Sequence, residues 1–307
     1  MFSRRHFLAG STLALVGGAV ARPSLVTAWQ QAPAAPPPVT PVFTAIRRNV
    51  GFFTGRGGTI GYLLDPGGIV VVDSQFPDSA KMCLDGLNER SKNRAIDFLI
   101  NTHHHGDHTG GNLVFKGAAQ KVVAHAKSAE HQRQPPGRPA PTTEQLYPDT
   151  TFTDSWRSQV GDEWVRAKYY GNAHTGGDAV ITFERANVAH MGDLMFNRRL
   201  PVVDRPAGAS LKNWATVIER AAADHTTDTV FIFGHGGTNQ PVTGSRADLM
   251  VMRDFLNGLL AFVQAEIRSG KTREQILAIR TPVPGFDTHG PLTEVVLTAA
   301  YGELTGA

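Results

Sequence analysis

Six consecutive residues, His103–His104–His105–Gly106–Asp107–His108, include four histidines and one aspartate. The preceding segment 95–100 is apolar and predicts a buried strand, which places the run against the core. Along an extended backbone, residues i and i+2 point the same way, so His103 and His105 project together and His104 points oppositely. Gly106 then allows a bend that turns Asp107 and His108 toward a second point. Uncompensated, such a polar run beside a core costs roughly several kcal/mol, and a bound cation removes that cost.

The composition is that of a globular protein with a sizeable core. Of the 307 residues, 41% are apolar and 19% are charged, which excludes a disordered polymer, a collagen-like fibre and a coiled coil. Cys83 is the single cysteine, so intrachain disulfides and thiolate zinc clusters are excluded. The formal net charge of +3, part of which belongs to the N-terminal segment, gives no electrostatic reason to expect a nucleic acid or membrane partner.

The N-terminal segment resembles a twin-arginine export signal. Ser3-Arg4-Arg5-His6-Phe7-Leu8 is followed by an apolar, glycine-containing run that is too short to span a bilayer as a stable helix. We therefore predict a signal peptide over residues 1–28, cleaved after residue 21 or 28, a proline-rich linker over 29–41 and one domain over 42–307. The prediction implies that the twin-arginine translocase is a partner during export, that the protein is periplasmic or secreted, and that it has no stable membrane anchor.

The body of the chain shows the same order of features twice: strand, aspartate, helix, strand, histidine. In the first half, the strand 68–73 ends at Asp73, a helix begins at residue 78, and the strand 95–100 leads into the histidine run. In the second half, a hairpin over 178–191 precedes Asp193, a helix covers 210–224, and the strand 229–233 leads to His235. Three helices are predicted to close the chain, and residues 131–148, rich in proline, predict an irregular loop beside the site. The alternative for this loop is a surface insertion without a function.

These motifs together resemble the metallo-β-lactamase-fold superfamily, whose members share a T-H-x-H-x-D-H loop and a later His, Asp and His. The corresponding residues here are 102–108, His174 within Gly171–Asp178, Asp193 after Met191-Gly192, and His235. The resemblance runs from about residue 44 to about residue 236. It implies an α/β fold, a four-layer αβ/βα sandwich, with the site at one edge between two sheets.

The resemblance also implies a ligand set for two metal ions. His103, His105 and His174 would hold the first ion, and Asp107, His108 and His235 the second. Asp193 would bridge both ions, and Asp73 would lie beneath the ligands. Independently, five imidazoles and two carboxylates without a thiolate suit Zn²⁺, with Fe or Mn as alternatives. We therefore predict two zinc ions per chain.

The expected activity is hydrolysis of a small carbonyl compound, an ester, thioester, lactone or amide, by a metal-bridging hydroxide. Asp107 and Asp193 are the predicted catalytic carboxylates, which fix the metals and relay a proton. Asp193 stands where true β-lactamases of this fold generally carry Cys or Ser, which favours the esters and lactones. Phe196 stands where quorum-signal lactonases usually carry Tyr, so the subfamily stays open.

Two alternatives to this activity remain. Export to the periplasm also suits hydrolysis of β-lactams, which is the second interpretation. A more distant one is a mononuclear-iron persulfide dioxygenase, because that class shares the H-x-H-x-D-H loop. Among the other histidines, His131 is considered for substrate contact because it lies beside the proline-rich loop, and His190 is interpreted as structural. The helical spacing of Trp214 places it in the core.

Overall fold

A computed structural model describes residues 40–306 of the chain. The predicted signal peptide, residues 1–28, and nearly all of the predicted linker lie outside the described residues. The strands are β1 (Val42–Arg47), β2 (Val50–Thr54), β3 (Ile60–Asp65), β4 (Gly68–Val72), β5 (Ile96–Asn101), β6 (Ala119–His125), β7 (Thr150–Phe152), β8 (Ser155–Val160), β9 (Glu163–Tyr169), β10 (Ala179–Phe183), β11 (Val188–His190), β12 (Phe196–Asn197), β13 (Val230–Ile232), β14 (His235–Gly236) and β15 (Thr243–Gly244). The α-helices are α1 (Pro77–Ser91), α2 (Gly106–Thr109), α3 (Ala126–Arg133), α4 (Leu211–Ala223), α5 (Arg246–Arg268), α6 (Arg273–Leu277) and α7 (Glu294–Thr305). Short 3₁₀ turns are η1 (Asn112–Phe115), η2 (Gly192–Leu194), η3 (Arg205–Ala207) and η4 (Asp287–His289).

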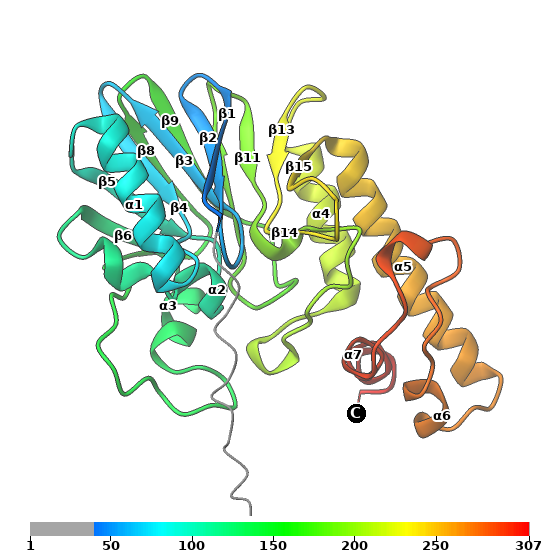
Figure 1. Cartoon of the computed structure of the whole chain (residues 1–307). Helices are drawn as coiled ribbons and strands as arrows, with labels where there is room; N and C mark the ends of the chain where they lie inside the picture. Colours follow the sequence, from blue (N-terminus) through cyan, green and yellow to red (C-terminus); the bar gives the residue numbers. More distant parts are fainter. Residues whose placement is uncertain (1–39, 307) are drawn as a thin grey trace, which may run out of the picture. The chain divides into compact units, whose positions relative to one another are not determined.

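The strands form two large sheets (Figure 1). The first runs in the order β1-β2-β3-β4-β5-β6-β7, and the second in the order β15-β13-β11-β10-β9-β8. Strands β4 and β5 are parallel neighbours in the first sheet, and β11 and β13 are parallel neighbours in the second. Each parallel pair is joined through a helix, α1 in the first half and α4 in the second, as expected for parallel strands. The predicted order of features in the two halves is therefore confirmed.

Side-chain alternation along the strands builds a four-layer sandwich. In β4, Val70 and Val72 face the second sheet and pack in one cluster with Ile181. Ile69 and Val71, on the opposite face of the same strand, pack against α1 instead. The outer face of the second sheet is covered by α4 and α5, which share a third cluster with β11 and β13 (Figure 1). This helix–sheet–sheet–helix order confirms the predicted αβ/βα fold class.

Three helices, α4, α5 and α6, begin at caps that are visible in the sequence. Ser245 and Asp248 form the capping box that begins α5, and Ser210 caps α4. The irregular segment predicted from residue 131 begins later, because α3 continues to Arg133 and ends just before Pro135. Among residues 40–306, no helix combines the length and the apolar character needed to cross a membrane.

Candidate metal centre

The predicted site residues lie at the carboxyl ends of strands from both sheets. Asp73 follows β4, the run 102–108 follows β5, Asp193 follows β11, and His235 follows β13. Because parallel neighbours end at the same edge of a sheet, these residues meet where the two sheets face each other. His174 joins them from the connection between β9 and β10. The seven predicted ligands therefore converge, although they span residues 103 to 235.

The first group consists of His103, His105, His174 and Asp193, whose ligand atoms all lie within 4.8 Å of one another. Nε2 of His174 is 3.5 Å from Oδ2 of Asp193, and Nε2 of His103 is 3.8 Å from the same oxygen. Nδ1 of His105 is 2.9 Å from Nε2 of His174. Three of the four side chains are buried, and His105 reaches partly into solvent.

The second group consists of Asp107, His108 and His235. Nε2 of His235 lies 3.1 Å from Oδ2 of Asp107. Oδ1 of Asp193 faces this group, 3.0 Å from Nε2 of His108 and 3.3 Å from Nε2 of His235. The two oxygens of Asp193 therefore face different groups. Such close approach requires Gly234, since a Cβ at that position would lie 2.1 Å from Oδ1 of Asp193.

Four of the five histidines are held through the ring nitrogen that points away from the centre. The partners are Thr102 Oγ1 for Nδ1 of His103, Asp204 Oδ2 for Nε2 of His105, Asp73 Oδ2 for Nδ1 of His108, and the carbonyl of Val202 for Nδ1 of His174. When a cation is bound, each imidazole would donate through that nitrogen, and its other nitrogen would offer a lone pair to the centre. This arrangement orients metal-ligating histidines in proteins.

Asp73 organises the base of the second group. Its carboxylate accepts from the backbone N–H and the hydroxyl of Thr102, both at 2.8 Å, and from His108 at 2.7 Å. The side chain is inaccessible to solvent, and its backbone φ of 66° lies in the left-handed region. Such a conformation is uncommon for residues other than glycine and persists where the surrounding contacts hold the backbone in place.

The electrostatics of the centre keep its carboxylates ionised. Burial alone would raise the pKa of Asp193, but His235 and His108 hold it well below its usual range. Burial opposes protonation of His108, yet Asp193 and Asp73 raise its pKa well above the ordinary value. In the first group burial outweighs the attraction of Asp193, and it lowers the pKa of His174 to about 3. Burial also lowers the pKa of His103 well below its ordinary value, so His103 and His174 present neutral imidazoles to an ionised carboxylate.

The donor set fits divalent cations. Nε2 of His103 and Oδ1 of Asp193 are buried without a hydrogen-bond partner among residues 40–306, although such atoms are normally satisfied. Both atoms point into the space shared by their group, where a cation would satisfy them. Neutral imidazoles with carboxylates and no thiolate suit zinc better than calcium or magnesium.

Asp204 is a neighbour of the centre that the sequence did not reveal. It caps η3, and its Oδ2 lies 2.8 Å from Nε2 of His105 and 3.5 Å from Nε2 of His104. Its only local signal is an N-cap position before Arg205-Pro206, which carries no information about histidines elsewhere in the chain. Its pKa is held well below the usual range: burial opposes this, and the hydrogen bonds from His104 and His105 prevail.

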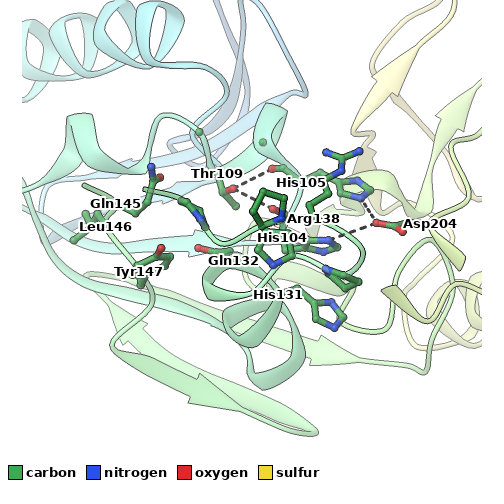
Figure 2. A pocket seen from close by; sticks show the side chains of 16 residues that line it. His104, His105, Thr109, His131, Gln132, Arg138, Gln145, Leu146, Tyr147 and Asp204 are labelled. Atoms are coloured by element: carbon green, nitrogen blue, oxygen red, sulfur yellow. Dashed lines mark hydrogen bonds and ion pairs between the residues drawn. The ribbon is translucent and has the colours of Figure 1, made fainter. Parts of the chain in front are cut away.

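The other histidines divide between the pocket and the core. His104 stays outside the first and second groups, as the alternation predicted, and lies with His131 in a pocket beside the centre (Figure 2). Their ring centroids are 4.9 Å apart.

His190 is buried and hydrogen-bonded to the backbone of Thr59 and Gly192, which confirms its structural interpretation. Trp214 is fully buried, as its helical spacing predicted.

Comparison with known proteins assigns the same region to one family. Residues 49–235 match the family described as the Metallo-beta-lactamase superfamily, which covers more than half of the chain. A metallo-beta-lactamase type 2 of Bacillus cereus is 25% identical over 62% of this chain and 72% of that protein. A hydroxyacylglutathione hydrolase of Methylococcus capsulatus is 30% identical over 44% of this chain and 47% of that protein.

Solved structures extend the likeness beyond the family match. The sec-alkylsulfatase Pisa1 of Pseudomonas sp. superimposes with a TM-score of 0.66 and 17% sequence identity, over 87% of this chain and 50% of that one. At this identity the likeness concerns the fold alone.

Proposed function

Because this chain belongs to the metallo-beta-lactamase superfamily, we propose that it is an exported, zinc-dependent hydrolase with two ions per chain that cleaves a small carbonyl compound. The substrate class is an ester, thioester, lactone or amide. The partners proposed are the substrate and, during export, the twin-arginine translocase, with neither a nucleic acid nor a stable membrane anchor.

One observation carries the proposal of two ions. Asp193 directs Oδ2 toward the first group and Oδ1 toward the second group, as a bridging carboxylate does. His103, His105 and His174 would hold one ion, Asp107, His108 and His235 the other, and Asp193 both. When bound, a pair of ions supplies an activated water at neutral pH and polarises the substrate carbonyl.

The carboxylates of this chain have different exposures and therefore different proposed roles. Asp193 is 3% exposed, which suits a residue that fixes geometry. Asp107 is 29% exposed, and its pKa lies below the usual value: burial opposes this, and the hydrogen bond from His235 prevails. Asp107 is therefore an ionised acceptor at the open side of the centre, placed to orient the attacking water. Asp73 and Asp204 act through the rings of His108 and His105.

A test of the hydrolase begins with the metal content of the processed, exported protein. We expect about two equivalents of zinc, and hydrolysis that is lost on chelation and restored by Zn²⁺. The panel includes an aryl ester, a homoserine lactone, a glutathione thioester and a chromogenic cephalosporin. Asp193→Asn should abolish turnover, whereas the matched surface variant Asp85→Asn should behave as the unmodified protein. Less than one equivalent of metal, with no activity restored by zinc, would contradict the proposal.

Hydrolysis of β-lactams is the second candidate. The relative from Bacillus cereus named as a metallo-beta-lactamase favours it, and the cephalosporin in the panel tests it. The relative named as a hydroxyacylglutathione hydrolase favours the thioester in the same way. Iron in place of zinc, together with oxygen consumption on a persulfide, would instead identify the dioxygenase alternative.

Export is a separate proposal that rests on Arg4 and Arg5. Replacing both with lysine should retain the protein in the cytoplasm of a bacterial host, because the twin-arginine pair is the recognised feature of this signal. Fractionation of the host cells measures the effect. Equal export of the unmodified and the double-lysine chains would contradict the proposal.

A further inference from the structure

A pocket of about 270 Å³ adjoins the first group (Figure 2). One wall is the segment 104–110, which includes His105 of the first group. The opposite wall is the proline-rich segment 131–147, and Asp204 contributes from a third segment. The predicted loop therefore does border the site. His105 belongs to both the pocket and the first group, so the pocket directly adjoins the centre.

The segment 135–147 lines the pocket largely with apolar side chains. Its lining includes Pro135, Pro136, Pro139, Pro141, Leu146 and Tyr147. Proline fixes its own backbone φ, so a wall with several prolines loses little conformational freedom when a ligand is bound. The volume of about 270 Å³ lies just below the usual range for small-molecule sites, roughly 300–1,000 Å³, which suits a compact part of a ligand rather than a whole large one.

The charges in the pocket leave one cation without a partner. The carboxylate of Asp204 already accepts from His105 and lies 3.5 Å from Nε2 of His104. Arg138 is exposed, and its guanidinium has no hydrogen bond or ion pair within residues 40–306. Arg138 lines the same pocket as His104 and Asp204 (Figure 2). Neighbouring cations such as Lys116 and Lys127 are paired with Glu144 and Glu130, respectively.

We propose that this pocket binds the acyl portion of an anionic substrate, in which a short apolar chain carries a carboxylate that pairs with Arg138. This inference rests on the proposed hydrolase and specifies its substrate class. The carbonyl to be cleaved lies at the centre, the chain contacts the prolines and Tyr147, and the carboxylate at the far end of the chain pairs with the guanidinium. Arg138 is thus a specificity-determining residue, able to form the bidentate pair that guanidinium and carboxylate groups favour.

The test uses two phenyl esters that differ only in the distal charge: the monophenyl ester of glutaric acid and phenyl valerate. The holoenzyme should favour the glutarate ester in kcat/KM. Arg138→Gln should raise KM for that ester about tenfold with little change in kcat, and leave phenyl valerate unaffected. The control Arg268→Gln removes an exposed arginine from the end of α5, and both esters should then behave as with the unmodified protein.

A second measurement separates this inference from the hydrolase. Binding of glutarate to the holoenzyme is followed by calorimetry, and Arg138→Gln should weaken it about tenfold while Arg268→Gln leaves it unchanged. If no ester is hydrolysed but Arg138→Gln still weakens glutarate binding, the proposed hydrolase activity is wrong and the proposed anion-binding pocket is supported. If esters are hydrolysed but Arg138→Gln alters neither KM nor glutarate binding, the proposed hydrolase activity is supported and the proposed anion-binding pocket is wrong.

Discussion

Oδ2 of Asp73 lies 2.7 Å from Nδ1 of His108, and neither side chain is accessible to solvent. Asp73 also accepts from the N–H and hydroxyl of Thr102, so its carboxylate joins the end of β4 to the segment after β5. This contact fixes the ring of His108 with Nε2 directed toward Asp193. The second group is therefore oriented by a residue that belongs to neither group.

Asp73→Asn should weaken binding of the metal at the second group about 10- to 100-fold. The amide keeps one acceptor but turns an N–H₂ toward either Thr102 or His108, both of which donate. Competition with a chromogenic chelator measures the affinity of each site. Asp85→Asn, an exposed change on α1, is the control and should leave both sites unaltered. Unchanged chelator competition in Asp73→Asn would show that His108 needs no such partner.

Removal of metal should destabilise the fold. Oδ1 of Asp193 and Nε2 of His103 are buried without a hydrogen-bond partner among residues 40–306, and they would lose the cation that satisfies them. At a free metal concentration of about 1,000 times Kd, each filled site contributes about 4 kcal/mol to the free energy of unfolding. Denaturant unfolding with and without a chelator measures the loss, and added Zn²⁺ should reverse it. Asp193→Asn should respond much less to the chelator. Identical midpoints in both conditions would argue against a metal in the native state.

Trp214→Phe should lower the free energy of unfolding by about 2–4 kcal/mol. The indole is fully buried, its Nε1 donates to the carbonyl of Leu194 at 3.1 Å, and its ring lies 5.5 Å from that of His174. The smaller ring leaves both a cavity and an unsatisfied carbonyl. Trp156→Phe, at a partly exposed position, should cost less than about 1 kcal/mol. Equal losses in the two variants, measured by denaturant unfolding, would contradict this account.

His289→Phe should flatten the acid dependence of stability. His289 stacks on Phe255 at 4.2 Å, and neither ring nitrogen has a partner among residues 40–306. Burial, with the charge of Arg198, lowers its pKa from 6.5 to about 4. Between these values the unfolded chain binds a proton that the folded chain does not, so stability present above pH 6.5 is lost on acidification, by up to about 3 kcal/mol.

The measurement compares the free energies of unfolding of the two chains at several pH values from 7 to 4, at equal metal content. The unmodified protein should lose more stability than His289→Phe as the pH falls. Parallel curves for the two chains would mean that His289 does not contribute to the acid dependence.

Local patterns were sufficient to predict most of the elements around the centre. The run Gly68–Val72 is continuously apolar and forms a strand buried on both faces, and Leu211, Trp214 and Ile218 recur at helical spacing and face the core. The motifs predicted that residues as distant as His103 and His235 would meet, and the structure brings them together. Their roles as metal ligands and catalytic groups remain predictions.

Contacts between distant segments without a motif could not be predicted. Asp204 lies 99 residues from His105, and locally it appears only as a helix cap. The alternation correctly kept His104 out of the first and second groups, but it gave no indication that His131 would lie beside it. The end of α3 was also missed, because a helix followed by prolines was interpreted as one irregular stretch.

Each group of the centre draws side chains from both halves of the chain, and His108 and His235 are 127 residues apart. An ion at either group is therefore a removable cross-link that closes a long loop, and such links restrict the unfolded chain most when the loop is long. Neither half carries a complete set of ligands by itself. Occupancy of the centre and association of the two halves should therefore be thermodynamically coupled, so a shortage of metal would weaken the packing between the two sheets as well as abolish activity.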